Sequence, residues 1–105
     1  MIARIAMLLA AVLLAAPVQA QEAGGLVGQG RGLFRDQGCY GCHTVGAMGT
    51  PIAPDLSHIG TKHDRSYLAR WLRDPSEQRP RAHMPKLQLT ESEVQALSAY
   101  LGSLR

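Results

Sequence analysis

The amino-acid sequence predicts a small all-α domain in which long loops join three main helices. Apolar residues recur at helical spacing in three stretches, roughly residues 26–37, 64–73 and 90–104, and no stretch alternates like a half-buried strand. Segments rich in glycine and proline separate the three stretches. The 105 residues contain no internal repeat, so we expect a single domain.

The N-terminal residues have the features of a secretory signal peptide. Arg4 precedes an apolar run at residues 5–16, and small residues ending at Ala20 follow. The run is shorter than the roughly 20 residues that span a bilayer. We therefore expect a signal peptide at 1–20, cleavage, a mature domain at 21–105 in the periplasm, and no stable membrane insertion after cleavage.

The charge of the mature chain excludes one class of partner. Residues 21–105 contain ten basic and eight acidic side chains, and the basic ones are scattered without a Lys/Arg-rich run. Nucleic-acid binding is therefore not expected. Two cysteines allow at most one disulfide, which excludes a disulfide-stapled secreted scaffold.

The first predicted helix carries an apolar face with a glycine in it. Leu26, Gly30, Leu33 and Phe34 share this face, and Gly38 provides a stop. An interior glycine costs about 1 kcal/mol relative to alanine. The cost is understandable if another backbone approaches closely at Gly30.

The other two predicted helices have clear ends. Pro75 ends the second, because the residue before proline avoids the α region. Thr90 and Glu93 form a capping box at the start of the third. We expect loop throughout residues 43–62, and loop again after Pro75. The apolar positions are Tyr67, Leu68, Trp71 and Leu72 in the second helix and Val94, Leu97, Tyr100, Leu101 and Leu104 in the third.

The pentapeptide CYGCH, residues 39–43, contains both cysteines and allows four interpretations. A thioredoxin-like redox pair needs a βαβ fold, for which the chain offers no strands. A zinc site would combine the cysteines with His58 and His63. Histidines of a zinc finger project from one helix, whereas these two enclose a glycine and follow a proline-rich loop. A disulfide would close a loop too small to stabilise much.

The fourth interpretation is covalent attachment of haem, which C-x-x-C-H indicates. Cys39 and Cys42 would add to the two vinyl groups, and His43 would follow beneath the iron as an axial ligand. Export is consistent with this chemistry, and a haem would supply the apolar bulk that a small domain lacks. We therefore predict one haem c, bound covalently through Cys39 and Cys42.

A six-coordinate haem needs a second metal ligand opposite His43. Met84 lies in the loop between the second and third predicted helices, and a thioether opposite histidine raises the reduction potential. We predict Met84 as this ligand and His83, its neighbour, as the main alternative. Weaker candidates are Met48, His58 and His63.

These motifs, in this order, resemble the class I c-type cytochromes, the small monohaem fold of soluble cytochrome c. The resemblance covers nearly all of residues 21–105. It implies that long loops wrap one covalent haem. It also implies that the first and last helices cross at right angles, with Gly30 and Phe34 of the first helix against Tyr100 of the last.

The resemblance implies two further cofactor-binding residues. The carbonyl of Pro54 would accept the ring N–H of the axial histidine, a bond that fixes the tautomer. The family has a glycine before this proline, whereas this chain has Ala53. Trp71 is either a core residue or a hydrogen-bond donor to a haem propionate, since buried indole N–H groups usually find a partner.

The expected function is one-electron transfer between redox proteins in the periplasm, without catalytic residues. A second hypothesis is a cytochrome subunit that accepts electrons within a larger periplasmic dehydrogenase, for example of the sulfite dehydrogenase type. A third is a haem enzyme or gas sensor, which needs an open or displaceable sixth position.

Overall fold

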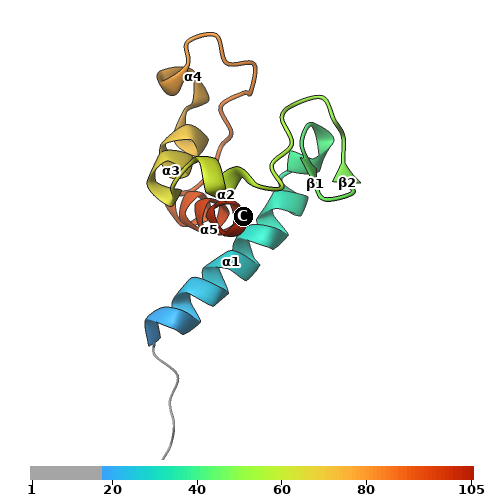
Figure 1. The fold of residues 1–105 in the computed structure, drawn as a ribbon. Helices are drawn as coiled ribbons and strands as arrows, with labels where there is room; N and C mark the ends of the chain where they lie inside the picture. Colours follow the sequence, from blue (N-terminus) through green and yellow to red (C-terminus); the bar gives the residue numbers. More distant parts are fainter. Residues whose placement is uncertain (1–17) are drawn as a thin grey trace, which may run out of the picture.

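The computed structural model describes residues 18–105, with side chains from residue 24 onward (Figure 1). Most of the predicted signal peptide, residues 1–17, lies outside the described residues. The elements in chain order are α1 (Val18–Asp36), a 3-10 turn η1 (Cys39–Gly41), β1 (Thr44–Val45), β2 (Met48–Gly49), α2 (Ile59–Lys62), α3 (Arg65–Arg73), α4 (Pro75–Gln78) and α5 (Glu91–Ser103).

The first and last helices form the centre of the fold. Figure 1 shows α5 almost end-on where α1 passes across it. A Cβ atom at Gly30 would collide with the Ala96 carbonyl and the Tyr100 side chain, so the two helices meet backbone to backbone. Beside this contact, the Phe34 and Tyr100 rings pack edge to face with centroids 5.7 Å apart. The close approach expected at Gly30 is confirmed.

Helix α1 begins earlier than the apolar pattern predicts. The structure describes it from Val18 onward, whereas the stripe begins at Leu26. The difference arises because the preceding residues include the helix formers Ala, Gln and Glu but contribute nothing to the stripe. The predicted cleavage position after Ala20 falls within this helix.

Helix α3 packs on α5 and completes the core. Leu68 and Leu72 are buried, and the Asp64 side chain caps the helix by accepting from the Tyr67 N–H. The expected end at Pro75 is confirmed, but the chain then forms the single turn α4, for which Pro75 supplies the first residue. The buried core consists of Phe34, Leu68, Ala69, Leu72, Val94, Leu97, Tyr100 and Leu101.

The capping box of α5 is confirmed. The Thr90 hydroxyl accepts from the Glu93 N–H, and the Glu93 carboxylate accepts from the Thr90 N–H at 2.9 Å. At the other end of the helix, Gly60 of α2 donates its N–H to the Leu104 carbonyl at 2.7 Å. Along its length, helix α5 contacts α1, α2 and α3.

The segment after CYGCH is more ordered than the expected loop. Strands β1 and β2 pair as an antiparallel ribbon, with Val45 opposite Met48, and α2 adds a helical turn. Strands of two residues are too short to show alternation, which is why the sequence pattern missed them.

The carboxylate of Asp55 holds this segment together. It accepts hydrogen bonds from the Thr44 hydroxyl at 2.8 Å and the Ser57 hydroxyl at 2.7 Å. The Ser57 hydroxyl in turn accepts from the Gly46 N–H in the ribbon's turn. Hydrogen bonds from Ser57 and Thr44 lower the pKa of Asp55 below its ordinary value.

Within the described residues, no helix is both long enough and apolar enough to cross a bilayer.

Gly30→Ala should lower the free energy of unfolding by about 1–3 kcal/mol, because the added methyl group forces α1 away from α5. Gly28→Ala is the matched control in the same helix, since nothing lies within 4 Å of a Cβ placed there. Gly28→Ala should leave stability unchanged or raise it by up to about 1 kcal/mol. Denaturant titration of both proteins measures the difference, and equal effects would contradict the backbone contact.

Asp55→Asn should destabilise the protein near neutral pH, because the amide keeps an acceptor oxygen but loses the charge that Ser57 and Thr44 solvate. A pKa that is lower in the folded state adds stability above the ordinary value of 3.8. That contribution is lost as the pH falls below this value, so the two proteins should converge in acid. Unfolding measured across acidic pH tests this, and a constant difference at every pH would contradict it.

Candidate functional site

The two cysteines and His43 lie in one tight turn directly after α1. Gly41 donates its N–H to the Gly38 carbonyl at 2.9 Å, and His43 donates its N–H to the Cys39 carbonyl at 2.9 Å. The second bond spans four residues, as in one helical turn. The turn therefore keeps both thiols and the imidazole within a few residues of the rigid end of α1.

The two thiols differ in environment. Cys39 is half-buried and Cys42 is exposed, and neither takes part in a disulfide. Burial raises the pKa of the Cys39 thiol, although a backbone hydrogen bond opposes part of this rise. The neutral thiol is therefore the favoured form of Cys39.

The imidazole of His43 is held by a hydrogen bond to the loop. Its Nδ1 lies 2.6 Å from the Pro54 carbonyl oxygen. A carbonyl only accepts, so Nδ1 carries the proton, and in the neutral ring Nε2 keeps a free lone pair. This is the tautomer in which a histidine binds a metal through Nε2, with its other ring nitrogen fixed by a carbonyl.

The loop reaches this position without the family's glycine. Ala53 donates its N–H to the Cys42 carbonyl at 2.7 Å, and Ile52 donates to the same oxygen at 3.2 Å. Within residues 18–105, every residue with a positive φ is a glycine. Alanine at 53 is therefore compatible with the turn that aims the Pro54 carbonyl.

Met84 and His83 differ in burial. Met84 is half-buried and packs against the core cluster, whereas His83 is exposed. The indole Nε1–H of Trp71 donates to the Met84 sulfur at 3.2 Å. The structure thus gives the half-buried Trp71 a partner other than the propionate that the family resemblance suggested.

The weaker ligand candidates are engaged elsewhere or exposed. Met48 is 61% exposed on the ribbon, and His58 is exposed. The His63 ring stacks on Tyr67 with centroids 4.0 Å apart. In the described part of the chain, no three His, Cys, Asp or Glu side chains gather to hold a metal, so the zinc interpretation gains no support.

Half-buried apolar side chains from both long loops, as well as from the helices, pack against the core cluster. A haem seated among them would bury apolar surface that the chain alone leaves partly exposed, at about 25 cal/mol per Å². Two thiols, a free Nε2 and a thioether are also the donor set of a haem c with histidine and methionine as axial ligands. The residues present therefore fit this group. The apolar set comprises Tyr40, Val45, Leu56, Ile59, Tyr67, Met84 and Leu89.

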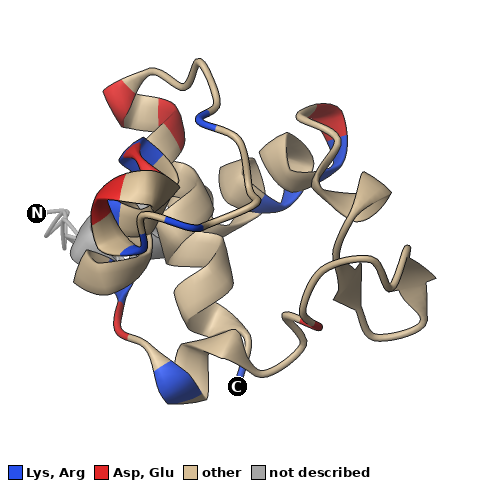
Figure 2. Ribbon diagram, turned by 90° about the horizontal axis from the view of Figure 1, so that it is seen from above, with Lys and Arg blue, Asp and Glu red and all other residues tan. Residues whose placement is uncertain are grey.

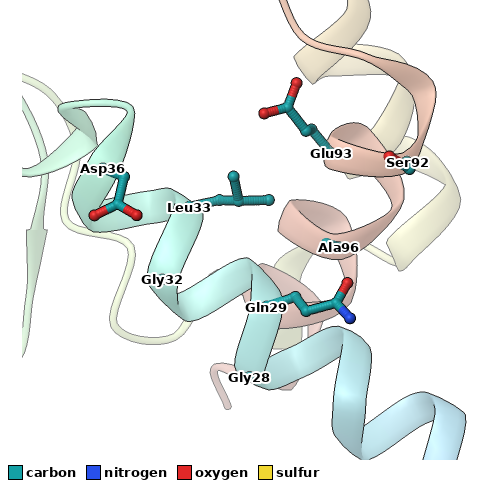
Figure 3. A pocket seen from close by; sticks show the side chains of 8 residues that line it. All are labelled: Gly28, Gln29, Gly32, Leu33, Asp36, Ser92, Glu93 and Ala96. Carbon is teal, nitrogen blue, oxygen red and sulfur yellow. The ribbon is translucent and has the colours of Figure 1, made fainter.

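A separate shallow depression lies between α1 and α5 and is open to solvent (Figure 3). None of its lining residues is a predicted site residue, and it follows from the close crossing of the two helices. Its lining residues are Gly28, Gln29, Gly32, Leu33, Asp36, Ser92, Glu93 and Ala96.

Two features of the site were not predicted from the sequence. The Asp55 network has a local signal, since a hydroxyl residue two positions after an aspartate often bonds to its carboxylate. The contact between Trp71 and Met84 joins residues that are 13 positions apart, on a helix and a loop, and it has no local signal.

Comparison with known proteins agrees with this geometry. The family model for cytochrome c matches residues 27–105, from the apolar face of α1 to the end of the chain. The match therefore includes CYGCH, Pro54, Trp71 and Met84.

Two curated relatives are both named cytochrome c oxidase subunit 2. The chain is 34% identical over 89 residues to the protein of Alkalihalophilus pseudofirmus, in a match covering 76% of this chain. It is 32% identical over 96 residues to the protein of Bacillus sp. strain PS3, covering 73% of this chain. The matched region spans 26% of each relative's length. The family match, the all-α architecture and the order of the motifs agree, and the chain belongs to the cytochrome c family as a class I c-type cytochrome.

Proposed function

We propose that this protein is a one-electron carrier that binds one haem c covalently through Cys39 and Cys42, with His43 and Met84 as axial ligands. The observation that carries the proposal is the bond between His43 Nδ1 and the Pro54 carbonyl. It leaves Nε2 as the free ring nitrogen, in the same turn as both thiols.

Each residue has a defined part in this proposal. The haem would supply the reversible ferric–ferrous couple. Cys39 and Cys42 tether it to the end of α1, and Pro54 fixes the tautomer and orientation of His43. Met84 provides a thioether, which favours a higher reduction potential than a second histidine would. No side chain needs to gain or lose a proton, so the carrier needs no catalytic residue.

The environment of Met84 supports this residue over its neighbour. Met84 packs against the core cluster, whereas the exposed His83 would have to exchange its hydration for a place against the core. A thioether carries no such cost. An enzyme or gas sensor with an open sixth position is correspondingly less favoured.

The relatives support a respiratory setting for electron transfer. Both are named cytochrome c oxidase subunit 2, and each is about four times as long as the matched region. We propose export to the periplasm and electron exchange with redox proteins there, the carrier being either free or a subunit of a larger complex such as a dehydrogenase. Co-purification with a larger redox chain would distinguish the subunit from the free carrier.

The surface around the attachment turn supports docking with little electrostatic steering. Residues 37–54 contain no Lys, Arg, Asp or Glu. Figure 2 shows no charged residue on the ribbon of β1 and β2. The charged residues lie mainly on the helices and on the loop after α4. Met48 and Ile52, 61% and 75% exposed, stand out in this segment. Brief docking of redox proteins needs less than about 1,200 Å² of buried surface.

The exported protein should show the narrow reduced absorption bands of haem c and a weak far-red band in the ferric state. Met84→Leu should abolish the far-red band, because this band reports sulfur bound to ferric iron. His83→Ala is the matched control and should keep it. A wild-type protein with haem bands but no far-red band would contradict the Met84 assignment and point to His83 or an open sixth position. A colourless wild-type protein would overturn the haem proposal.

Electron transfer should depend only weakly on salt. We expect the oxidation rate of the ferrous protein, by membranes containing a cytochrome c oxidase, to fall less than about threefold from low to physiological ionic strength. Ile52→Ser should slow the reaction at every ionic strength, whereas Arg81→Ser should have little effect. A steep loss of rate with salt would instead indicate docking through the basic loop that holds Arg79, Arg81 and Lys86.

A further inference from the structure

The loop that carries Met84 has little hydrogen bonding of its own. Within the described residues, positions 83–89 take part in no backbone–backbone hydrogen bond. The bond from Trp71 Nε1–H to the Met84 sulfur is the one side-chain hydrogen bond found for this stretch in the described structure. Besides the packing of Met84 against the core cluster, one hydrogen bond, from α3, fixes the position of the sulfur.

Trp71 is well placed to serve as an anchor. It lies on α3, whose neighbouring residues Leu68 and Leu72 are 5% and 4% exposed and pack into the core with α5. The Asp64 cap fixes the start of this helix. Figure 1 shows the loop leaving α4 and returning to α5 without any element between them. The contact thus connects an irregular loop to a rigid element.

The chemistry of a thioether allows one sulfur to serve two partners. The sulfur has two lone pairs, so one can bind iron while the other accepts the indole N–H. Indole is a donor only, so it cannot compete with the sulfur for the metal. Donation from the N–H draws electron density from the sulfur, which makes it a weaker donor to ferric iron and favours the reduced state.

We propose that Trp71 is a positioning residue for the sixth ligand: its indole N–H holds the Met84 sulfur in place and raises the reduction potential. This inference rests on the proposed role of Met84 as a ligand. It differs from the propionate role suggested by the family resemblance, because the hydrogen-bond partner is the thioether.

Trp71→Phe in the haem-loaded protein is the direct test, because phenylalanine keeps the aromatic bulk but cannot donate. The reduction potential should fall, and the far-red band of the ferric protein should change in energy. Ser66→Ala is the control on the same helix. It removes one exposed hydroxyl group, which accepts a hydrogen bond from Arg70, so the potential and the band should stay at their wild-type values.

The readouts separate this proposal from its alternatives. If Trp71 served a propionate, Trp71→Phe would alter how the potential depends on pH while the far-red band stayed fixed, and the proposal would be overturned. Equal shifts in Ser66→Ala and Trp71→Phe would also overturn it, since the effect would then not depend on the indole N–H. A wild-type protein without the far-red band would reject the ligand role of Met84, and this inference with it.

A measurement on the wild-type protein keeps the test decisive if the variant fails to load haem. The chain has a single tryptophan, so its indole N–H gives one resolved NMR signal. In the ferrous protein this proton should exchange slowly with solvent and show a nuclear Overhauser contact to the Met84 methyl group. Rapid exchange without that contact would contradict the proposal.

Discussion

The rest of the structure depends on the backbone contact between α1 and α5 at Gly30. This contact fixes the end of α1, and the turn with both thiols and His43 follows directly from that end. Helix α3 packs against α5. Helix α2 also contacts α5, and its Gly60 N–H donates to the Leu104 carbonyl just after that helix. The proposed ligands lie in two segments, the turn and the Met84 loop. The turn follows α1 and the loop leads into α5, so both segments are joined to this pair of helices.

The parts of the fold that the sequence could predict are those with local causes. Three helix ends depend only on neighbouring residues: a capping box, a proline after a helix and a glycine at a helix end. The roles of Thr90, Pro75 and Gly38 could therefore each be predicted from the local sequence. The start of α1, the ribbon and α4 were missed because they leave no apolar period. The glycine on an apolar helix face predicted a close backbone approach at Gly30, but its partner on the last helix came only from the family resemblance.

The site also contains features that local sequence predicts and features that it does not. CYGCH is contiguous, so its chemistry is visible in five letters, whereas the Pro54 carbonyl required knowledge of the family. The hydrogen bond in the structure adds the physical reason why Ala53 suffices: its N–H bonds to Cys42, and its φ is not positive. The hydrogen bond from Trp71 to Met84 could not be predicted from the sequence. It depends on the path of an irregular loop, which no pattern of residue types indicates.

The pairing of the first and last described helices also determines when the domain can fold. Gly30 and Ala96 are far apart in sequence, so the central contact forms only after a long loop closes, and such contacts form late. A chain emerging in N- to C-terminal order therefore presents CYGCH before α5 is available to build the core. That delay leaves the two thiols accessible before the core forms, an order that suits the proposed covalent attachment of haem.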